Sequence, residues 1–179
     1  MRSRPNALNR VRHPAAVLSK LTLAGTFLTA CAVPPYVAPA NAPIAHVDLV
    51  SKLGVVFDTL DPRTCPSLHR TVLADFTDAA TMKASRPVAD AIGHRVGSLA
   101  LGRDIEAGRP IILGAGFGHG CGVAYRFVPE AGARYEAEAD IVGANCRFRI
   151  YRVAPQSSDG GTVRALDPSV ERFDACSAS

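Results

Sequence analysis

The second half of the chain alternates apolar and polar residues with the two-residue period of β-strands. In residues 121–127 the odd positions are apolar or aromatic, and in residues 135–141 apolar residues alternate strictly with acidic ones. Residues 146–150 follow the same rule, with Arg147 and Arg149 at the polar positions. The pattern predicts three strands, each with one face in the core and one wet face, where Glu and Arg rows of neighbouring strands pair.

Shorter apolar runs earlier in the chain predict further strands. These runs are residues 44–57 with a break at Gly54, residues 71–76, residues 95–105 and residues 110–113. One short helix is predicted over residues 87–92, because Pro87 suits a first helical turn and Gly93 suits a stop. Residues 156–161 are polar and glycine-rich, so the C-terminal tail is expected to be mobile unless a disulfide fastens it.

An apolar run at residues 21–30 follows five cationic residues and no acidic one, which is the pattern of a secretory signal. The run is too short to span a bilayer, which takes about 20 apolar residues. Its end, Leu28-Thr29-Ala30-Cys31, resembles the bacterial lipobox, in which signal peptidase II cuts before a cysteine that carries diacylglycerol and a further acyl chain such as palmitate. The alternative is an ordinary signal peptide cleaved after Ala30 or in the Pro/Ala stretch beyond it.

Residues 32–43 contain four prolines and four alanines and predict a semi-extended tether that holds the domain at most a few tens of ångströms from the membrane. The predicted organisation is therefore a lipoprotein signal peptide at residues 1–30, a lipidated N-terminus and flexible tether at residues 31–43, and one β-domain at residues 44–179. Ala32 after Cys31 is the pattern that enterobacterial-type sorting rules associate with the outer membrane.

Residues 127–135 resemble the tyrosine corner of Greek-key sandwiches, in which a Tyr hydroxyl bonds to nearby upstream backbone as the chain crosses between sheets. The corner residues are Pro129, Gly132 and Tyr135. We expect the Tyr135 hydroxyl to bond backbone within residues 129–133 and Gly132 to need a positive φ. The predicted fold is all-β, a disulfide-stapled β-sandwich of immunoglobulin-like Greek-key topology.

Four cysteines remain once Cys31 is set aside, and in an oxidising compartment they form two disulfides with three alternative pairings. In a simple meander the strands of Cys121 and Cys146 lie two places apart, about 9.5 Å. A disulfide needs Cα atoms within about 7 Å, which facing sheets allow. We therefore predict Cys121–Cys146 across the core and, by elimination, Cys65–Cys176.

The basic composition of the chain belongs mostly to the leader. Five of the 20 basic residues lie in residues 1–30, which leaves 15 basic against 16 acidic residues. This balance removes the main argument for nucleic-acid binding, which needs a basic surface on the folded part.

Residues 114–122 place glycine at every second position and contain His119 and Cys121. A phosphate-binding loop needs a helix after it, but the residues that follow alternate as in a strand. A His119–Cys121 nucleophile needs a thiolate, which the competing cysteines disfavour. A hairpin loop with glycines chosen for backbone freedom is the main interpretation.

Other candidate chemistry is scattered. His46, His69 and His94 have no metal-site spacing, so a zinc or copper site requires distant loops. Asp58 with Asp61, and Asp75 with Asp78, are carboxylate pairs that suit hydrolysis, although solvated loop acids are far commoner. No metal or cofactor is assigned.

The segments Ile105-Glu106-Ala107-Gly108-Arg109-Pro110 and Phe-x-Pro-Glu-Ala-Gly-x-x-Tyr-Glu, with a Cys after each, resemble a loose group of uncharacterised bacterial envelope lipoproteins. The resemblance covers residues 105–153 and implies an exported β-rich lipoprotein without implying an activity. We expect a non-enzymatic binding or structural module of the cell envelope, anchored to the membrane through the lipid on Cys31, facing the periplasm and with an envelope protein as a candidate partner. The alternative is an envelope hydrolase or metal-binding protein with a site assembled from loops.

Overall fold

The computed structural model describes residues 35–52, 54–60, 70–88, 97–118, 120–155 and 162–174, and residues 33–179 form one compact unit. The predicted signal peptide and the segment that resembles a lipobox, with Cys31, lie outside the described residues. So do Cys65, Cys176 and the histidines at positions 69, 94 and 119.

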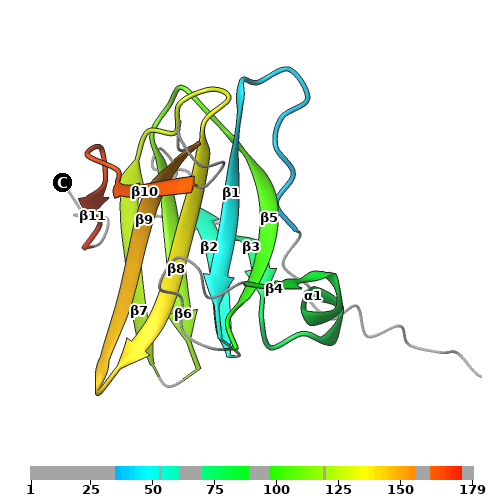
Figure 1. The fold of residues 1–179 in the computed structure, drawn as a ribbon, viewed down its shortest axis with the longest axis vertical. Coiled ribbons are helices and arrows are strands. Elements are labelled where there is room, and N and C mark those ends of the chain that lie inside the picture. The colour runs from blue at the N-terminus through cyan, green and yellow to red at the C-terminus, as the bar shows by residue number, and fades with distance from the viewer. Residues whose placement is uncertain are drawn as a thin grey trace, which may run out of the picture. The chain divides into compact units, whose positions relative to one another are not determined.

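The domain is a β-sandwich of two sheets, seen as two layers in Figure 1. In one sheet the strands follow the order β10 (Thr162–Leu166), β9 (Asn145–Pro155), β8 (Arg134–Val142), β1 (Ile44–Ser51), β5 (Leu99–Glu106) and β4 (Arg86–Pro87). In the other the order is β11 (Glu171–Arg172), β7 (Cys121–Phe127), β6 (Ile111–Phe117), β2 (Val55–Leu60) and β3 (Thr71–Asp75). The one helix among the described residues is α1 (Ala79–Ala84). The predicted fold class is confirmed.

Among the described strands, the chain crosses between the sheets from β1 to β2, from β3 to β4, from β5 to β6, from β7 to β8 and from β10 to β11. β1 pairs antiparallel with β5 and parallel with β8, while β2 pairs antiparallel with β6. Hairpins within one sheet, such as β6–β7 and β8–β9, therefore alternate with crossings to the facing sheet, as in Greek-key sandwiches. The immunoglobulin-like form of this topology stays a prediction.

Both sheets direct apolar side chains into a common core. Val47 and Leu49 of β1, Phe57 of β2, Leu113 of β6 and Ile150 of β9 are fully or almost fully buried. Burial of each such side chain stabilises the fold by roughly 1.5–3 kcal/mol. Aromatic rings join the two layers, as the centroids of Phe57 and Phe148 lie 6.0 Å apart.

Most of the predicted strands are confirmed. Residues 44–57 form β1 and β2, separated at Gly54, whose φ is 91°. The three strands predicted from strict alternation are β7, β8 and β9. The strand expected at residues 110–113 is longer, because β6 continues to Phe117 through Gly114 and Gly116.

The helix prediction at residues 87–92 is wrong at Pro87, which lies in β4, and residues 89–96 lie outside the described part. The helix is α1, eight residues earlier. Asp78 caps it by accepting a hydrogen bond of 2.9 Å from the Thr81 amide. The Asp78 side chain accepts a hydrogen bond from an N–H that would otherwise be unpaired in the first helical turn, which favours a helix start at this position. Pro87 is a weaker signal for a helix start, because edge strands also tolerate proline.

The wet face predicted for β8 is also wrong in part. Glu136 is only 7% exposed, and the Glu138 and Asp140 side chains are nearly buried. Arg164 of β10 pairs with Glu136, lies 3.9 Å from Glu138, and stacks 4.6 Å from the centroid of the Tyr151 ring. The expected pairing across the β8–β9 hairpin is confirmed for Asp140 and Arg147, which lie 2.8 Å apart.

The described part of the predicted flexible tether, residues 35–43, is bound to the domain. Pro35 bridges in parallel to Val72 of β3, and the Tyr36 amide donates to the Val72 carbonyl at 2.9 Å. The Tyr36 hydroxyl accepts a bond of 3.0 Å from the Glu106 amide, and the Tyr36 ring packs against the core. Composition alone misled the prediction, because one tyrosine and edge-strand backbone suffice to dock a proline-rich segment.

The tyrosine corner is confirmed. The Tyr135 hydroxyl accepts a hydrogen bond of 3.0 Å from the Glu130 amide, and the side chain is buried against Phe127, with the ring centroids 5.4 Å apart. Burial raises the pKa of the Tyr135 hydroxyl, because the phenolate is poorly solvated there. Gly132 has φ 73° and donates its amide to the Ile44 carbonyl at 2.8 Å. The corner therefore fixes where the chain passes from β7 to β8.

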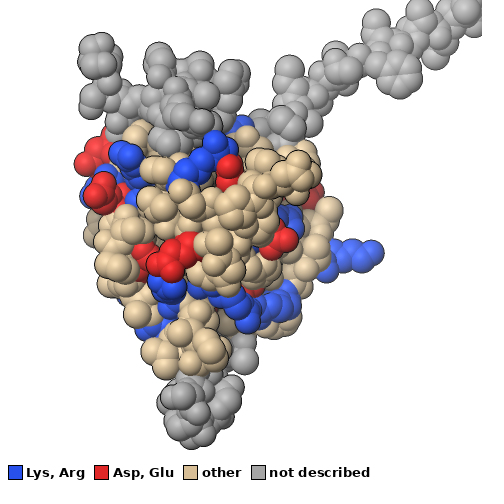
Figure 2. Space-filling model, turned by 90° about the horizontal axis from the view of Figure 1, so that it is seen from above, with Lys and Arg blue, Asp and Glu red and all other residues tan. Residues whose placement is uncertain are grey.

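Figure 2 views the molecule from the end at which the corner lies and shows acidic and basic side chains interspersed there. Two ion pairs of this end join Glu130 to Arg152 at 2.5 Å and Glu106 to Arg109. Exposed pairs of this kind contribute little stability, typically under about 1 kcal/mol.

We predict that Tyr135→Phe lowers the free energy of unfolding by about 0.5–1.5 kcal/mol, because it removes only the hydroxyl bonded to the Glu130 amide and leaves the ring packing intact. Urea unfolding of the domain from residue 35 onward measures this change. Tyr151→Phe is the control, because its hydroxyl accepts a hydrogen bond of 3.3 Å from the exposed Arg149 side chain rather than from backbone. Equal effects of the two substitutions contradict a structural role for the corner bond.

Candidate functional site

The glycine-rich segment forms a hairpin. Gly114 and Gly116 lie in β6, Gly122 lies in β7 opposite Gly116, and the turn between them contains Gly118 and Gly120, with φ 80° at Gly120. The strand β7 follows where a phosphate-binding loop requires a helix. Among these five glycines, only Gly120 in the turn has a positive φ and so needs the backbone freedom of glycine. The hairpin is confirmed, but most of the predicted loop lies in the strands β6 and β7. His119 lies outside the described residues.

Cys121 and Cys146 form a disulfide, as predicted, with Cα atoms 6.2 Å apart. It joins β7 of one sheet to β9 of the other. Because the Cys121 sulfur is bonded to Cys146, it is not available as a thiolate, and the His119–Cys121 nucleophile hypothesis is wrong for this form of the protein. The Cys65–Cys176 pairing lies outside the described residues and stays a prediction.

The candidate carboxylates have structural partners. Asp58 lies in β2 rather than in a turn, is largely buried, and pairs with Arg70 at 3.1 Å. Burial raises the pKa of the Asp58 carboxyl, and the Arg70 charge opposes part of that rise. Asp75 accepts bonds from the amide and hydroxyl of Thr77, and Asp78 caps α1. Asp61 lies outside the described residues.

His46 is the one candidate histidine within the described residues. Its Nδ1 lies 2.9 Å from an Asp104 oxygen, and its Nε2 lies 3.8 Å from Asp48. The ring lies close to Gly102, where a Cβ would come within 2.8 Å of Nε2. Asp48 also contacts Arg86 at 3.0 Å and Arg134 at 3.5 Å, so two cations compete for its charge. In the described part of the chain, no three His, Cys, Asp or Glu side chains gather in a metal-binding arrangement.

The sandwich has an open side between β7 and β9. β10 pairs only with residues 151–155 of β9, and β11 pairs only with Tyr125 and Arg126 of β7. Within the described residues, β9 from Asn145 to Arg149 therefore has no strand partner on the side opposite β8. The Cys121–Cys146 disulfide closes the bottom of this open side.

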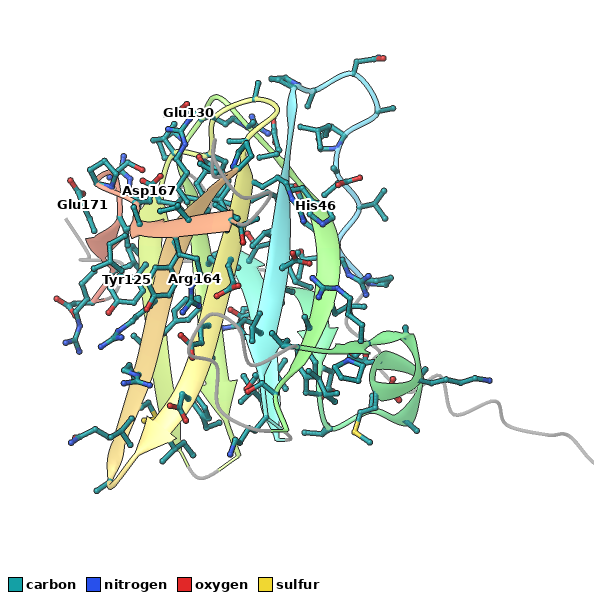
Figure 3. All side chains as sticks on the ribbon, in the orientation of Figure 1. His46, Tyr125, Glu130, Arg164, Asp167 and Glu171 are labelled. Atoms are coloured by element: carbon teal, nitrogen blue, oxygen red, sulfur yellow. A yellow bond between two sulfur atoms is a disulfide. The ribbon has the colours of Figure 1, made fainter. Side chains whose placement is uncertain are left out.

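A groove of about 360 Å³ lies on the open side above the disulfide. The Tyr125 and Phe148 rings, with centroids 5.6 Å apart, form its aromatic wall. Its other lining residues are Cys146, Arg147, Arg149, Ile150, Leu166, Asp167 and Val170. Figure 3 shows Tyr125 and Asp167 on this side of the molecule, at the strands β9–β11, and His46 well away from them on β1.

The roof of the groove is a turn held by Asp167. Its carboxylate accepts bonds from the amide and hydroxyl of Ser169 at 2.9 and 2.5 Å, and its own amide donates to the Ile150 carbonyl at 3.2 Å. Leu166, which directly precedes this turn, lines the groove and is 65% exposed. This element was not predicted, because the C-terminal tail was expected to be held by a disulfide alone. The Asp-Pro-Ser pattern at residues 167–169 is the local signal for a turn.

A second hollow, of about 440 Å³, lies between β3, α1 and β5. Its polar groups are already bonded: Asp78 caps α1, Asp75 binds Thr77, and the Arg103 side chain donates to the Leu73 carbonyl at 2.7 Å. We therefore take the groove between β7 and β9 as the candidate functional site.

In comparisons with known proteins, no protein-family model, curated protein or solved structure matches the chain. The class that the fold and the site define is a β-sandwich domain with a groove on its disulfide-clamped open side.

We predict that removal of the Cys121–Cys146 disulfide lowers the free energy of unfolding by about 3 kcal/mol, because the bond closes a loop spanning 25 residues in the unfolded chain. Urea unfolding of Cys121→Ser, Cys146→Ser and the double variant measures this. The double variant is expected to lose about as much as either single variant, since both remove the same bond. Additive losses contradict the pairing.

Proposed function

We propose that the chain is a membrane-anchored bacterial envelope lipoprotein whose β-sandwich is a non-enzymatic binding module. The lipobox at Cys31 supports the anchor, and a disulfide supports an oxidising, exported location. Several acyl chains on one cysteine suffice for stable anchoring. Among the described residues, no helix is long and apolar enough to cross a membrane.

The groove between β7 and β9 is the observation that carries the binding function. It combines an aromatic wall, exposed Leu166, and two arginines with a strand edge that lacks a partner among the described residues. Binding sites are concave and mostly apolar, with a few polar groups that fix the orientation of a ligand. The candidate partner is an envelope component that reaches this open side.

The docking of residues 35–43 against the domain supports a fixed orientation of the domain relative to the membrane. Four peptide steps separate Cys31 from Pro35, and an extended chain covers at most about 3.6 Å per step, or about 14 Å. Pro35 lies against β3, which is the last strand of its sheet, and β7 with β11 is at the opposite end of that sheet. Figure 1 likewise shows residues 35–43, in blue, and β9–β11 at opposite edges of the domain. In this proposal the groove faces away from the membrane, toward the periplasm if the anchor is in the outer membrane.

We predict that a photo-reactive amino acid in place of Val37, which is 81% exposed, captures phospholipid in cells, whereas one in place of Leu166 does not. The reason is that Val37 lies two residues after Pro35, the first described residue beyond the lipid-bearing Cys31, whereas Leu166 lies at the opposite edge of the domain. Mass spectrometry of the cross-linked protein measures the capture. Cys31→Ala is the control and is expected to abolish lipid capture at Val37.

Persistence of lipid capture in Cys31→Ala contradicts the lipid anchor. Equal capture from Val37 and Leu166 contradicts the orientation and leaves the anchor standing.

A further inference from the structure

Among the strands that the structure describes, β9 has no partner on the side opposite β8 from Asn145 to Arg149, and this edge presents backbone groups that are suited to strand addition. The Ile150 carbonyl accepts a bond from the Asp167 amide on the side of β9 opposite β8. In an antiparallel strand the backbone groups of every second residue point to the same side. The amides and carbonyls of Phe148 and Cys146 therefore point to the open side, as Ile150 does, and neither residue has a strand partner there within the described residues.

In the described part of the chain, the edge carries the charged side chains of Arg147 and Arg149 but none of the other devices that usually block strand addition. Those other devices are proline, bulges and inward-pointing charges. Residues 145–150 contain no proline, pair with β8 in unbroken register, and direct Phe148 and Ile150 into the core. Residues 145–150 of β9 therefore form a regular strand edge, with apolar side chains directed into the core and the groove beside it.

The side chains around the edge set the pattern of an added strand. Its inward positions would face the groove wall of Tyr125 and Phe148 beneath Val170. Its outward positions would lie beside Arg147 and Arg149, which project from the outer face of β9. An apolar residue therefore fits each inward position and an acidic residue each outward position.

β8 shows that β9 already accepts a strand of this pattern on its other edge. Ala137 and Ala139 of β8 are buried, whereas Glu138 and Asp140 lie opposite Arg149 and Arg147. The Asp140–Arg147 distance of 2.8 Å shows that the acidic positions reach the arginines. Arg149 is exposed and lies within 3.3 Å of the Tyr151 hydroxyl, so its charge is accessible from the open edge as well.

Self-association through this edge is disfavoured by the same charges. Antiparallel pairing of β9 with β9 of a second copy would bring the Arg147 and Arg149 rows together, and like charges on facing strands are destabilising. Charge complementarity instead favours an acidic partner.

We propose that the open edge of β9 binds an extended peptide segment in which apolar and acidic residues alternate, added to the six-stranded sheet as a strand in continuation of β10. This inference rests on the proposed binding function of the groove and names the chemistry of the partner. Backbone hydrogen bonds provide the affinity, and the groove with Arg149 selects the side-chain pattern.

The test uses the full-length lipidated protein in detergent and a fluorescent octapeptide of alternating valine and glutamate, with fluorescence anisotropy as the readout. The matched peptide has lysine in place of glutamate, and we expect it to bind at least roughly tenfold more weakly. Arg149→Glu is expected to weaken binding of the glutamate peptide by roughly tenfold or more. Lys83→Glu, the same charge change on α1, is expected to leave it unchanged.

Two N-methylated versions of the glutamate peptide test the backbone contact. One carries N-methyl groups on the valines and the other on the glutamates. In an edge strand only every second amide faces the neighbour, so one version should lose binding and the other keep it. Equal binding of both versions, or equal binding of the lysine peptide, overturns the inference.

Failure of the glutamate peptide to bind also overturns the inference. In that case, lipid capture at Val37 that depends on Cys31 would still support the membrane-anchored module. The peptide-binding proposal and the anchoring proposal can therefore be contradicted independently.

Discussion

The disulfide between Cys121 and Cys146 is the constraint on which the arrangement of this sandwich depends. β7 and β9 lie in different sheets, and both lack a full-length strand partner on the open side among the described residues. Hydrophobic burial alone is non-directional and does not fix the gap between two such edges. The covalent bond holds their Cα atoms at 6.2 Å, so the groove above it has a fixed width at its base.

Local signals made part of this structure predictable. Strict alternation identified β7, β8 and β9, and the Pro-Gly-Tyr corner with its upstream hydrogen bond placed β7 and β8 in different sheets. Once Cys121 and Cys146 lay on facing sheets, disulfide geometry was sufficient to pair them. These inferences succeeded because each depended on residues close together in sequence or on a covalent length.

Features that depend on distant residues were missed. Arg164 of β10 covers the acidic face of β8 only because β9 folds between the two strands, and nothing near Glu136 in sequence indicates this. Docking of Tyr36 depends on β3 and on the Glu106 amide, which lies 70 residues away. The groove joins β7, β9 and the Asp167 turn, so no single segment carries its pattern. The candidate site was therefore less predictable than the fold.

The open edge of β9 is the central claim, and amide hydrogen exchange by NMR tests it most directly. The amides of Arg147 and Arg149 face β8 and should exchange slowly, whereas those of Cys146 and Phe148 face the open side and should exchange fast despite the burial of the Phe148 side chain. This alternation along one strand is the predicted result. Uniform slow exchange from Cys146 to Arg149 would show that the edge is already paired and would contradict the account.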